Sequence, residues 1–169
     1  FVLLPLLAFA ADPPPLETAP AVDLKKYAGK WYEIARLPNR FQKDCTGNVT
    51  ATYTLRDDGR ITVVNECREG DEIERAEGVA RVPAGSPGNA VLEVRFAPAF
   101  LSWLPVWGDY RIIALDPEYR HAMVGTRDRK YLWILARSPK LEETVVRRLL
   151  DQARRQGFQV DQVQRTPHQ

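Results

Sequence analysis

The chain has 169 residues, of which 24 are lysine or arginine and 22 are aspartate or glutamate, so its formal net charge is +2. This length suits one domain that can bury a sizeable core, and the charges are scattered without the basic block that would favour a nucleic-acid partner. With only two cysteines and two histidines, the sequence offers little material for a metal site, and we expect neither a metal nor a cofactor.

The start of the chain is apolar. Residues 1–11 end in small side chains, and we interpret them as the back half of a secretory signal with Ala8-Phe9-Ala10 as its cleavage site; a buried strand or short helix is the alternative. The run is shorter than the roughly 20 apolar residues that span a bilayer, and no cysteine precedes Cys45 to carry a lipid anchor. We therefore expect an exported protein, periplasmic or secreted, and leave open an association with the outer membrane.

Residues 12–21 are rich in proline and are expected to form an extended linker before a domain at 22–165, with a tail at 166–169. Within that domain, apolar alternation bounded by turn residues predicts eight strands, at 30–37, 48–56, 61–67, 73–82, 90–96, 109–115, 120–126 and 131–137. Short antiparallel strands leave exposed edges unless the sheet closes. We therefore predict an all-β fold, an eight-stranded antiparallel up-and-down β-barrel, whose interior suits one small ligand.

The first predicted strand contains Gly29 and Trp31, which suggests a turn followed by a large apolar plug at one end of the barrel. Arg137 follows the last predicted strand, and a guanidinium over an indole ring is stabilising by roughly 0.5–2 kcal/mol. If these side chains meet, the first and last strands are neighbours. Glu33 shares the face of Trp31, where it would pair with Arg36 or meet a ligand head group; a solvated position at the rim is the alternative.

The clearest hairpin turns at Asp58-Gly59, a strong tight-turn signal. Cys45 lies just before this hairpin and Cys67 lies at its end. We favour a disulfide between them, which would hold the opening loop to the sheet, because export permits disulfides. The rival is a free nucleophilic cysteine, which would require an activated thiolate.

Residues 100–107 join two predicted strands at the end of the barrel opposite Trp31. A loop so rich in tryptophan and leucine should not face water without a reason, and aromatic side chains favour membrane interfaces. We predict that this loop contacts a membrane or a partner; a lid over the barrel mouth or a dimer contact is the alternative, and the chain is a monomer or a homodimer. The residues concerned are Phe100, Leu101, Trp103, Leu104 and Trp107.

One helix is predicted after the strands. Ser138 is the expected N-cap, Pro139 the first helical residue and Gly157 the end. Apolar residues recur between them at helical spacing, which predicts one buried stripe against the barrel wall. The stripe consists of Leu141, Val145, Leu149 and Ala153, with Val146 and Leu150 beside it.

Over residues 22–165 these features resemble the lipocalins, and most closely the bacterial lipocalin and apolipoprotein D branch. The segment 29–33, with Gly29 and Trp31, resembles the first signature of the family, and Arg137 resembles the third. Asp116 matches one residue of the usual Thr-Asp-Tyr turn. The resemblance implies structural roles for these four residues. It also implies a cup that stores or carries a lipid, a lysophospholipid or fatty acid, for maintenance of the cell envelope.

The resemblance further implies that Trp133 points into the barrel, and strand alternation then places apolar side chains and a few polar ones beside it. We predict that these residues contact the ligand. They are Val49, Ala51, Tyr53, Leu55, Val63, Asn65, Leu92, Val94, Phe96, Tyr110, Ile112, Tyr131, Trp133 and Leu135. The alternative is a closed core that the same side chains simply fill.

We expect no enzymatic activity. The sequence contains no Gly-x-Ser-x-Gly elbow and no phosphate-binding glycine loop, and neither His121 nor His168 has an evident catalytic partner. Two other functions stay open: an interaction or dimerisation module that uses residues 100–107, and a lipid-modifying enzyme that uses a cysteine.

Overall fold

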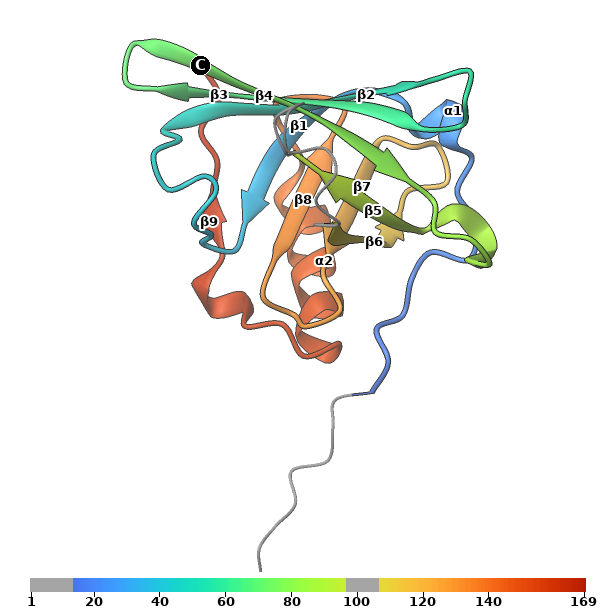
Figure 1. Cartoon of the computed structure of the whole chain (residues 1–169). Coiled ribbons are helices and arrows are strands. Elements are labelled where there is room, and N and C mark those ends of the chain that lie inside the picture. Colours follow the sequence, from blue (N-terminus) through green and yellow to red (C-terminus); the bar gives the residue numbers. More distant parts are fainter. Residues whose placement is uncertain (1–13, 97–106) are drawn as a thin grey trace, which may run out of the picture.

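The computed structural model describes residues 14–96 and 107–169 (Figure 1). Its antiparallel strands follow one another around a closed barrel, so the predicted fold class is confirmed. The strands are β1 Gly29–Arg36, β2 Gly47–Leu55, β3 Ile61–Glu69, β4 Glu72–Arg81, β5 Val91–Arg95, β6 Gly108–Leu115, β7 His121–Gly125 and β8 Leu132–Ala136. All of their bounds lie within one or two residues of the predicted ones. The residues interpreted as a secretory signal lie outside the described part of the chain.

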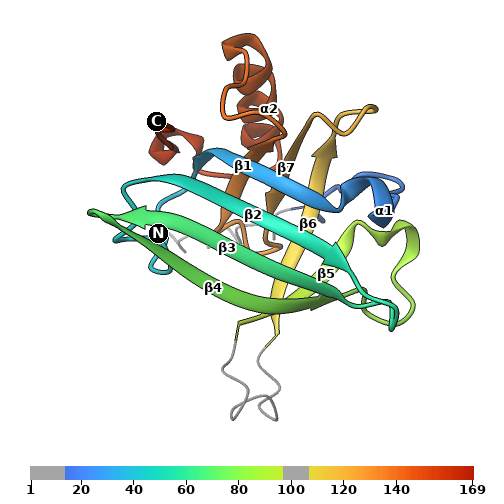
Figure 2. The same cartoon turned by 90° about the horizontal axis from the view of Figure 1, so that it is seen from above.

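Closure of the barrel depends on β1, which has a hydrogen-bonded neighbour on each side. Tyr32 pairs with Ala136 of β8, and Trp31 pairs with Ala51 of β2. The first and last barrel strands are therefore neighbours. Figure 2 shows β1 to β4 side by side, with the β3–β4 turn at one end of these strands and the short helix α1 (Leu24–Tyr27) at the other.

Helix α1, which was not predicted from the sequence, crosses the barrel end just before β1. The Asp23 carboxylate caps it by accepting a 2.9 Å hydrogen bond from the backbone N–H of Lys25. Upstream, the expected linker is extended but is not separate from the barrel. Leu16 is buried in the outer cluster, and the N–H of Ala19 donates to the Ile112 carbonyl at 2.9 Å. The proline-rich stretch is thus partly attached to the barrel wall.

Helix α2 (Glu143–Arg155) packs on the outside of the barrel (Figure 1). Its predicted start was wrong: Glu142, not Ser138, is the N-cap, and no side chain caps the helix there. Residues 138–140 are exposed, so no packing stabilises a helical turn at that point. The predicted end is confirmed, because Phe158 N–H donates to the Ala153 carbonyl at 3.1 Å and Gly157 adopts a left-handed φ of 93°.

Hydrophobic clusters lie on both faces of the barrel wall. On the outside, Val146, Leu149 and Ala153 of α2 are buried with Met123 and Ile134 of the sheet. Leu141 and Val145, expected in the middle of the stripe, are only partly buried. The inner cluster lies within the barrel and includes Trp31, Tyr53, Val63, Leu92, Ile112 and Val124.

The last residues of the chain complete the barrel wall. The short strand β9 (Gln164–Arg165) pairs with β1 through Ala35 and Arg165, where β1 has separated from β2. Beyond β9, the N–H of Asn48 donates to the Pro167 carbonyl at 2.9 Å. Gly47 permits this close approach, since a Cβ there would lie only 2.7 Å from the Pro167 oxygen. Residues 166–169, expected as a tail, fill the gap between β1 and β2.

Candidate functional site

The inner face of the barrel carries the predicted ligand-binding residues. Residues paired in register share a face, and the pairs Trp31–Ala51, Ala51–Asn65 and Tyr53–Val63 follow that inner face from β1 to β3. The inner cluster contains Ala51, Tyr53, Leu55, Val63, Leu92, Val94, Tyr110, Ile112, Trp133 and Leu135. Phe96 lies against Gly78, and Tyr131 stacks on Trp133 with ring centroids 5.9 Å apart. Thirteen of the fourteen positions are thus brought together, whereas Val49 is buried but belongs to neither hydrophobic cluster. Contact of these residues with a ligand stays a prediction.

Burial along the inner face is uneven. Towards the α1 end of the barrel, which we call the closed end, Tyr53, Ala90 and Ala122 are buried. Towards the opposite, open end, Asn65, Val94 and Trp133 face inward yet remain partly accessible. Val124, the register partner of Trp133, is nevertheless buried. Burial alone therefore does not decide between a ligand cavity and a filled barrel, and both alternatives stay open.

Trp31 and Arg137 seal the closed end. The Trp31 side chain has no exposed surface, and the guanidinium carbon of Arg137 lies 3.8 Å from the centre of the indole ring. The indole N–H donates to the Tyr27 carbonyl at 2.8 Å. The predicted contact between the two signature residues is present, and it ties α1 to β1 and to the end of β8.

Arg137 also donates hydrogen bonds to backbone carbonyls of several elements. Its guanidinium donates to the carbonyls of Lys26 at 2.7 Å, Lys30 at 3.0 Å and Tyr119 at 3.2 Å. Gly29, with φ of 99°, leaves room for this group, because a Cβ there would lie 3.2 Å from Nη1 of Arg137. One cation thus holds α1, β1 and the β6–β7 turn together.

Three tyrosine hydroxyls meet inside the barrel above this seal. The Tyr110 hydroxyl lies 2.7 Å from that of Tyr27 and 2.9 Å from that of Tyr53. Burial raises the pKa of all three, that of Tyr53 to about 12, so the groups stay protonated at neutral pH. This part of the apolar interior therefore contains a compact neutral polar group.

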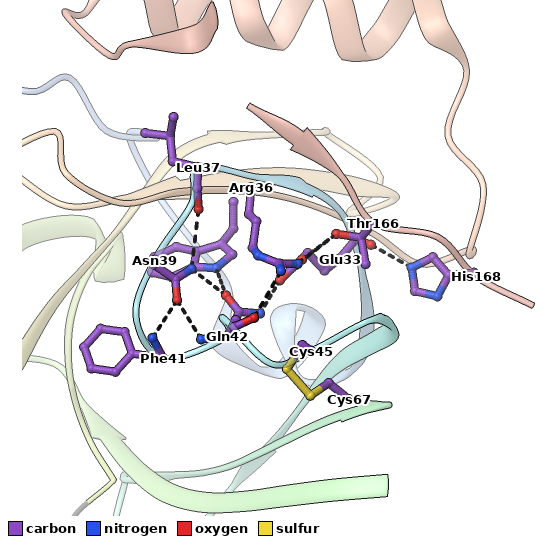
Figure 3. Close-up of polar contacts among 11 residues, drawn as sticks. Glu33, Arg36, Leu37, Asn39, Phe41, Gln42, Cys45, Cys67, Thr166 and His168 are labelled. Carbon is purple, nitrogen blue, oxygen red and sulfur yellow. Dashed lines mark hydrogen bonds and ion pairs between the residues drawn. A yellow bond between two sulfur atoms is a disulfide. The ribbon is translucent and has the colours of Figure 1, made fainter. Parts of the chain in front are cut away.

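A second polar cluster lies at the open end, around Glu33 (Figure 3). Glu33 is buried, and its carboxylate accepts hydrogen bonds from Arg36 and from the Gln42 amide, each at 2.6 Å. The Gln42 oxygen in turn accepts from the Trp133 indole N–H at 2.9 Å and from the Asn39 amide at 2.7 Å. Of the three possibilities stated for Glu33, the pairing with Arg36 is present, the solvated position at the rim is not, and contact with a ligand head group stays a prediction. The same amide also fixes the orientation of Trp133.

The C-terminal segment closes this cluster from outside. The Thr166 hydroxyl donates to the Glu33 carboxylate, and a ring nitrogen of His168 lies 2.7 Å from the Glu33 carbonyl oxygen (Figure 3). Arg36 is almost fully buried, and its Nε has no hydrogen-bond partner among the described residues. A buried ion pair of this kind depends on every member being present.

The disulfide between Cys45 and Cys67 is confirmed, with Cα atoms 5.7 Å apart. It joins the β1–β2 connection, which contains Gln42, to β3 at the open end. Both cysteines of the chain are used in it, so no free thiol remains for a nucleophile. The connection that holds Trp133 is thereby tied to the wall.

Asp116 organises the β6–β7 turn. It is buried, and its carboxylate accepts from the Arg120 side chain at 2.8 Å and from the backbone N–H of Glu118 at 3.2 Å. The Arg120 hydrogen bond is the main cause that lowers the pKa of Asp116 to about 2. His121 lies 4.0 Å from this carboxylate, and burial lowers the pKa of its imidazole.

The large exposed apolar side chains of the described residues gather at the open end. Phe41 lies in the β1–β2 connection, Ile73 next to the β3–β4 turn and Phe96 directly after β5. Of the predicted contact loop, only Trp107 is among the described residues, where its ring lies between Arg81 and Arg95 at 3.9 and 4.7 Å. Phe100, Leu101, Trp103 and Leu104 lie outside them, so the loop contact stays a prediction.

Comparison with known proteins identifies the family. The family model named lipocalin-like domain matches residues 22–168. The chain belongs to the lipocalin-like family. It is 45% identical over 140 residues to the outer membrane lipoprotein Blc of Escherichia coli K12, covering 82% of this chain and 75% of that protein. It is also 38% identical over 153 residues to temperature-induced lipocalin-1 of Arabidopsis thaliana, covering 90% and 82%.

The likeness extends to animal lipocalins. Bovine apolipoprotein D is 31% identical over 137 residues, which cover 76% of this chain and 68% of that protein. The structure of insecticyanin from the tobacco hornworm Manduca sexta superposes with a TM-score of 0.75 at 20% identity, covering 92% and 86% of the two chains. The resemblance to the bacterial lipocalin and apolipoprotein D branch is confirmed. Lipocalins bind small hydrophobic ligands and are in general not enzymes.

Some residues of the site were missed from the sequence. Tyr27 and Gln42 enter the interior from a short helix and a connection, where no strand alternation predicts a direction, and Thr166 comes from the expected tail. Within the described ranges, no three His, Cys, Asp or Glu side chains are placed to hold a metal ion. The helices of those ranges are also too short or too polar to cross a membrane.

Proposed function

We propose that the chain binds an acyl amphiphile, a lysophospholipid or a fatty acid, with its hydrocarbon chain in the open half of the barrel and its head group at the rim. The observation that carries this proposal is the accessible inner surface around Ala51, Val94 and Trp133, which is apolar although it faces the inside. Apolar side chains that line an accessible interior favour a hydrocarbon ligand, because each buried CH₂ contributes about 0.8 kcal/mol.

The chain's relatives support the same proposal. The bacterial relatives are outer membrane lipoproteins by name, and the plant and animal relatives are a lipocalin and an apolipoprotein by name. We therefore propose storage or transport of lipid for the cell envelope, in an exported protein. The disulfide supports an oxidising compartment such as the periplasm or the exterior.

Titration of the purified protein with lysophosphatidylcholines of increasing chain length tests this function. Two additional methylene groups should tighten binding by about fifteenfold until the chain fills the open half. Organic extraction followed by mass spectrometry should also recover acyl lipid from the protein as purified. Equal affinity for short and long chains, with no extractable lipid, would exclude the acyl-chain proposal.

A substitution that fills the proposed ligand space with a larger side chain tests where the ligand binds. Ala51→Trp places an indole in the accessible half and should reduce lysophospholipid affinity by at least tenfold, whereas Thr52→Trp, on the opposite face of the same strand, should leave it unchanged. Circular dichroism checks that both variants fold. If Ala51→Trp does not fold, Val94→Phe is the substitute. If a folded variant with the larger side chain inside the barrel keeps the wild-type affinity for lysophospholipid, the proposal is wrong.

We further propose that lipid enters from a membrane that the open end touches. Phe41, Ile73 and Phe96 are exposed there, and exposed apolar side chains that gather at one end favour a membrane or partner surface. Combined Phe41→Ser and Ile73→Ser substitutions should reduce co-sedimentation with phospholipid vesicles, while Val64→Ser on the outer wall should not. Unchanged co-sedimentation would favour the alternative, an interaction or dimerisation surface.

A further inference from the structure

The three tyrosine hydroxyls form a bridge across the barrel. Tyr53 belongs to β2 and Tyr110 to β6, and these two strands lie on opposite walls of the eight-stranded order. Their hydroxyls meet at 2.9 Å, and Tyr27 from α1 joins them. Tyr27 and Tyr53 are buried, whereas Tyr110 keeps some accessible surface. The bridge therefore borders the accessible half of the interior as its floor.

The number of protons in this cluster exceeds the number of acceptors used. Each hydroxyl has one proton to donate, and the three oxygens make two contacts, both through Tyr110. Each contact uses one proton, whichever hydroxyl donates. Among the described residues, no other acceptor lies within hydrogen-bond distance of these groups. Within the described part of the chain, one O–H is thus left without a partner in every arrangement, and a buried donor in that condition is costly.

The surroundings define the kind of acceptor that fits. No cationic side chain hydrogen-bonds to the three hydroxyls in the described part of the chain, and Arg137 instead lies against the ring of Trp31. Arg137 acts on the Tyr27 hydroxyl only through its electric field, so a carboxylate or phosphate buried here would have no cation in hydrogen-bond contact, which makes its transfer from water unfavourable. A neutral oxygen, such as that of a hydroxyl, ketone or ester, carries no such penalty and accepts the available proton.

We propose that the Tyr27–Tyr53–Tyr110 cluster is a binding site for a neutral oxygen on the buried end of the ligand. The inference rests on the proposed function, in which the head group stays at the open rim. It narrows the ligand class to amphiphiles whose hydrocarbon chain carries an oxygen at or near its far end. Without such a site, an oxygenated chain end would be rejected from an apolar barrel.

The experiment compares two ligands that differ only at that end: lysophosphatidylcholine with a palmitoyl chain, and the same molecule with an ω-hydroxypalmitoyl chain. The zwitterionic head group is too polar to enter the barrel, so both chains enter in the same direction. By isothermal titration calorimetry, the wild-type protein should bind the ω-hydroxy ligand at least as tightly as the unmodified one. A tenfold weaker affinity of the wild-type protein for the ω-hydroxy ligand would overturn the proposal.

The triple variant Tyr27→Phe/Tyr53→Phe/Tyr110→Phe removes all three hydroxyls and keeps the rings, so that no O–H of the cluster remains to donate to the ligand. It should bind the palmitoyl ligand as the wild-type protein does, but the ω-hydroxy ligand about tenfold more weakly. The control Tyr32→Phe removes a hydroxyl outside the barrel, where the ring meets His168, and should preserve wild-type behaviour. Equal binding of both ligands by the triple variant would contradict the proposal.

Two further outcomes are distinguishable. If the wild-type protein binds neither ligand, the proposed function fails and this inference fails with it. If it binds the palmitoyl ligand and rejects the ω-hydroxy one, only this inference fails, and the free proton is then satisfied by water. If the triple variant does not fold, the double variant Tyr53→Phe/Tyr110→Phe, which keeps only the hydroxyl of Tyr27 next to the closed end, should show a smaller loss for the ω-hydroxy ligand; no loss relative to the wild-type protein would count against the site.

Discussion

The two ends of the barrel are held by different kinds of interaction. At the closed end, one guanidinium covers the buried Trp31 and donates to backbone carbonyls from three elements. At the open end, side chains hold one another: Glu33, Arg36 and Gln42 form a buried polar cluster that Thr166 completes. Backbone carbonyls are present whatever the sequence, whereas the polar cluster at the open end depends on each of its members.

This difference fits the proposed function. An end that never opens is best sealed by packing around a large side chain, since burial of Trp31 does not depend on charges elsewhere. An end through which lipid passes needs an opening with a fixed frame and side chains that can rearrange. The disulfide fixes the frame, and the hydrogen-bonded side chains can exchange their partners. The first prediction therefore concerns the closed end, where the expected effect is largest.

Trp31→Ala should lower the free energy of unfolding by about 4 kcal/mol, because the substitution leaves a large cavity and removes the partner of Arg137. Urea denaturation followed by circular dichroism measures the change. Trp133→Ala is the matched control at the open half, where the indole is only partly buried and its loss should cost less than half as much. Equal losses at the two positions would show that the ends do not differ in packing.

At the open end, Glu33→Leu should lower the free energy of unfolding by about 3 kcal/mol, since it leaves Arg36 charged, buried and without its carboxylate. The double variant Glu33→Leu/Arg36→Met should recover most of that loss, because an apolar pair of similar size avoids the unpaired charge. A double-mutant cycle, with Arg36→Met as the second single variant and unfolding by chemical denaturant, gives the coupling free energy between the two side chains. If the stability losses of the two single variants add up to the loss of the double variant, the side chains do not depend on each other and the contrast with the closed end is wrong.

The sequence predicts the closed end better than the open end, and the reason is physical. Gly29, Trp31 and Arg137 lie at strand ends, where alternation and the order of strands decide which residues meet. The disulfide could be expected from two cysteines flanking one hairpin. Gln42 and Thr166 reach the interior from a connection and from the C-terminal segment, whose paths depend on hydrogen bonds formed only after the barrel closes.

The helix illustrates the same limit. Its end at Gly157 follows from local backbone chemistry, but its start depends on where the buried stripe first meets the wall. The local signal at Ser138 and Pro139 was therefore misleading. The inner face of the strands was predictable because each side chain's direction follows from a period of two residues. The tyrosine bridge was not, since Tyr27 comes from the unpredicted helix α1.

The smallest effect concerns the Asp116 turn next to the closed-end seal. The folded-state pKa of Asp116 is about 2, below its ordinary value of 3.8, so its contribution to stability is present above pH 3.8 and is lost as the pH falls towards 2. Because Arg120 is 67% exposed, solvent weakens the pair, and we expect its contribution to stability to be smaller than those of the two changes above. Asp116→Asn should therefore be less stable than the wild-type protein at neutral pH, and the difference should shrink between about pH 5 and pH 2.

Denaturation at several pH values measures this difference in stability, with Arg120→Gln as a second variant that should reproduce most of the pH dependence. A difference that stays constant with pH would mean that the carboxylate acts through hydrogen bonds to the turn backbone, which the asparagine retains in part, and not through its charge.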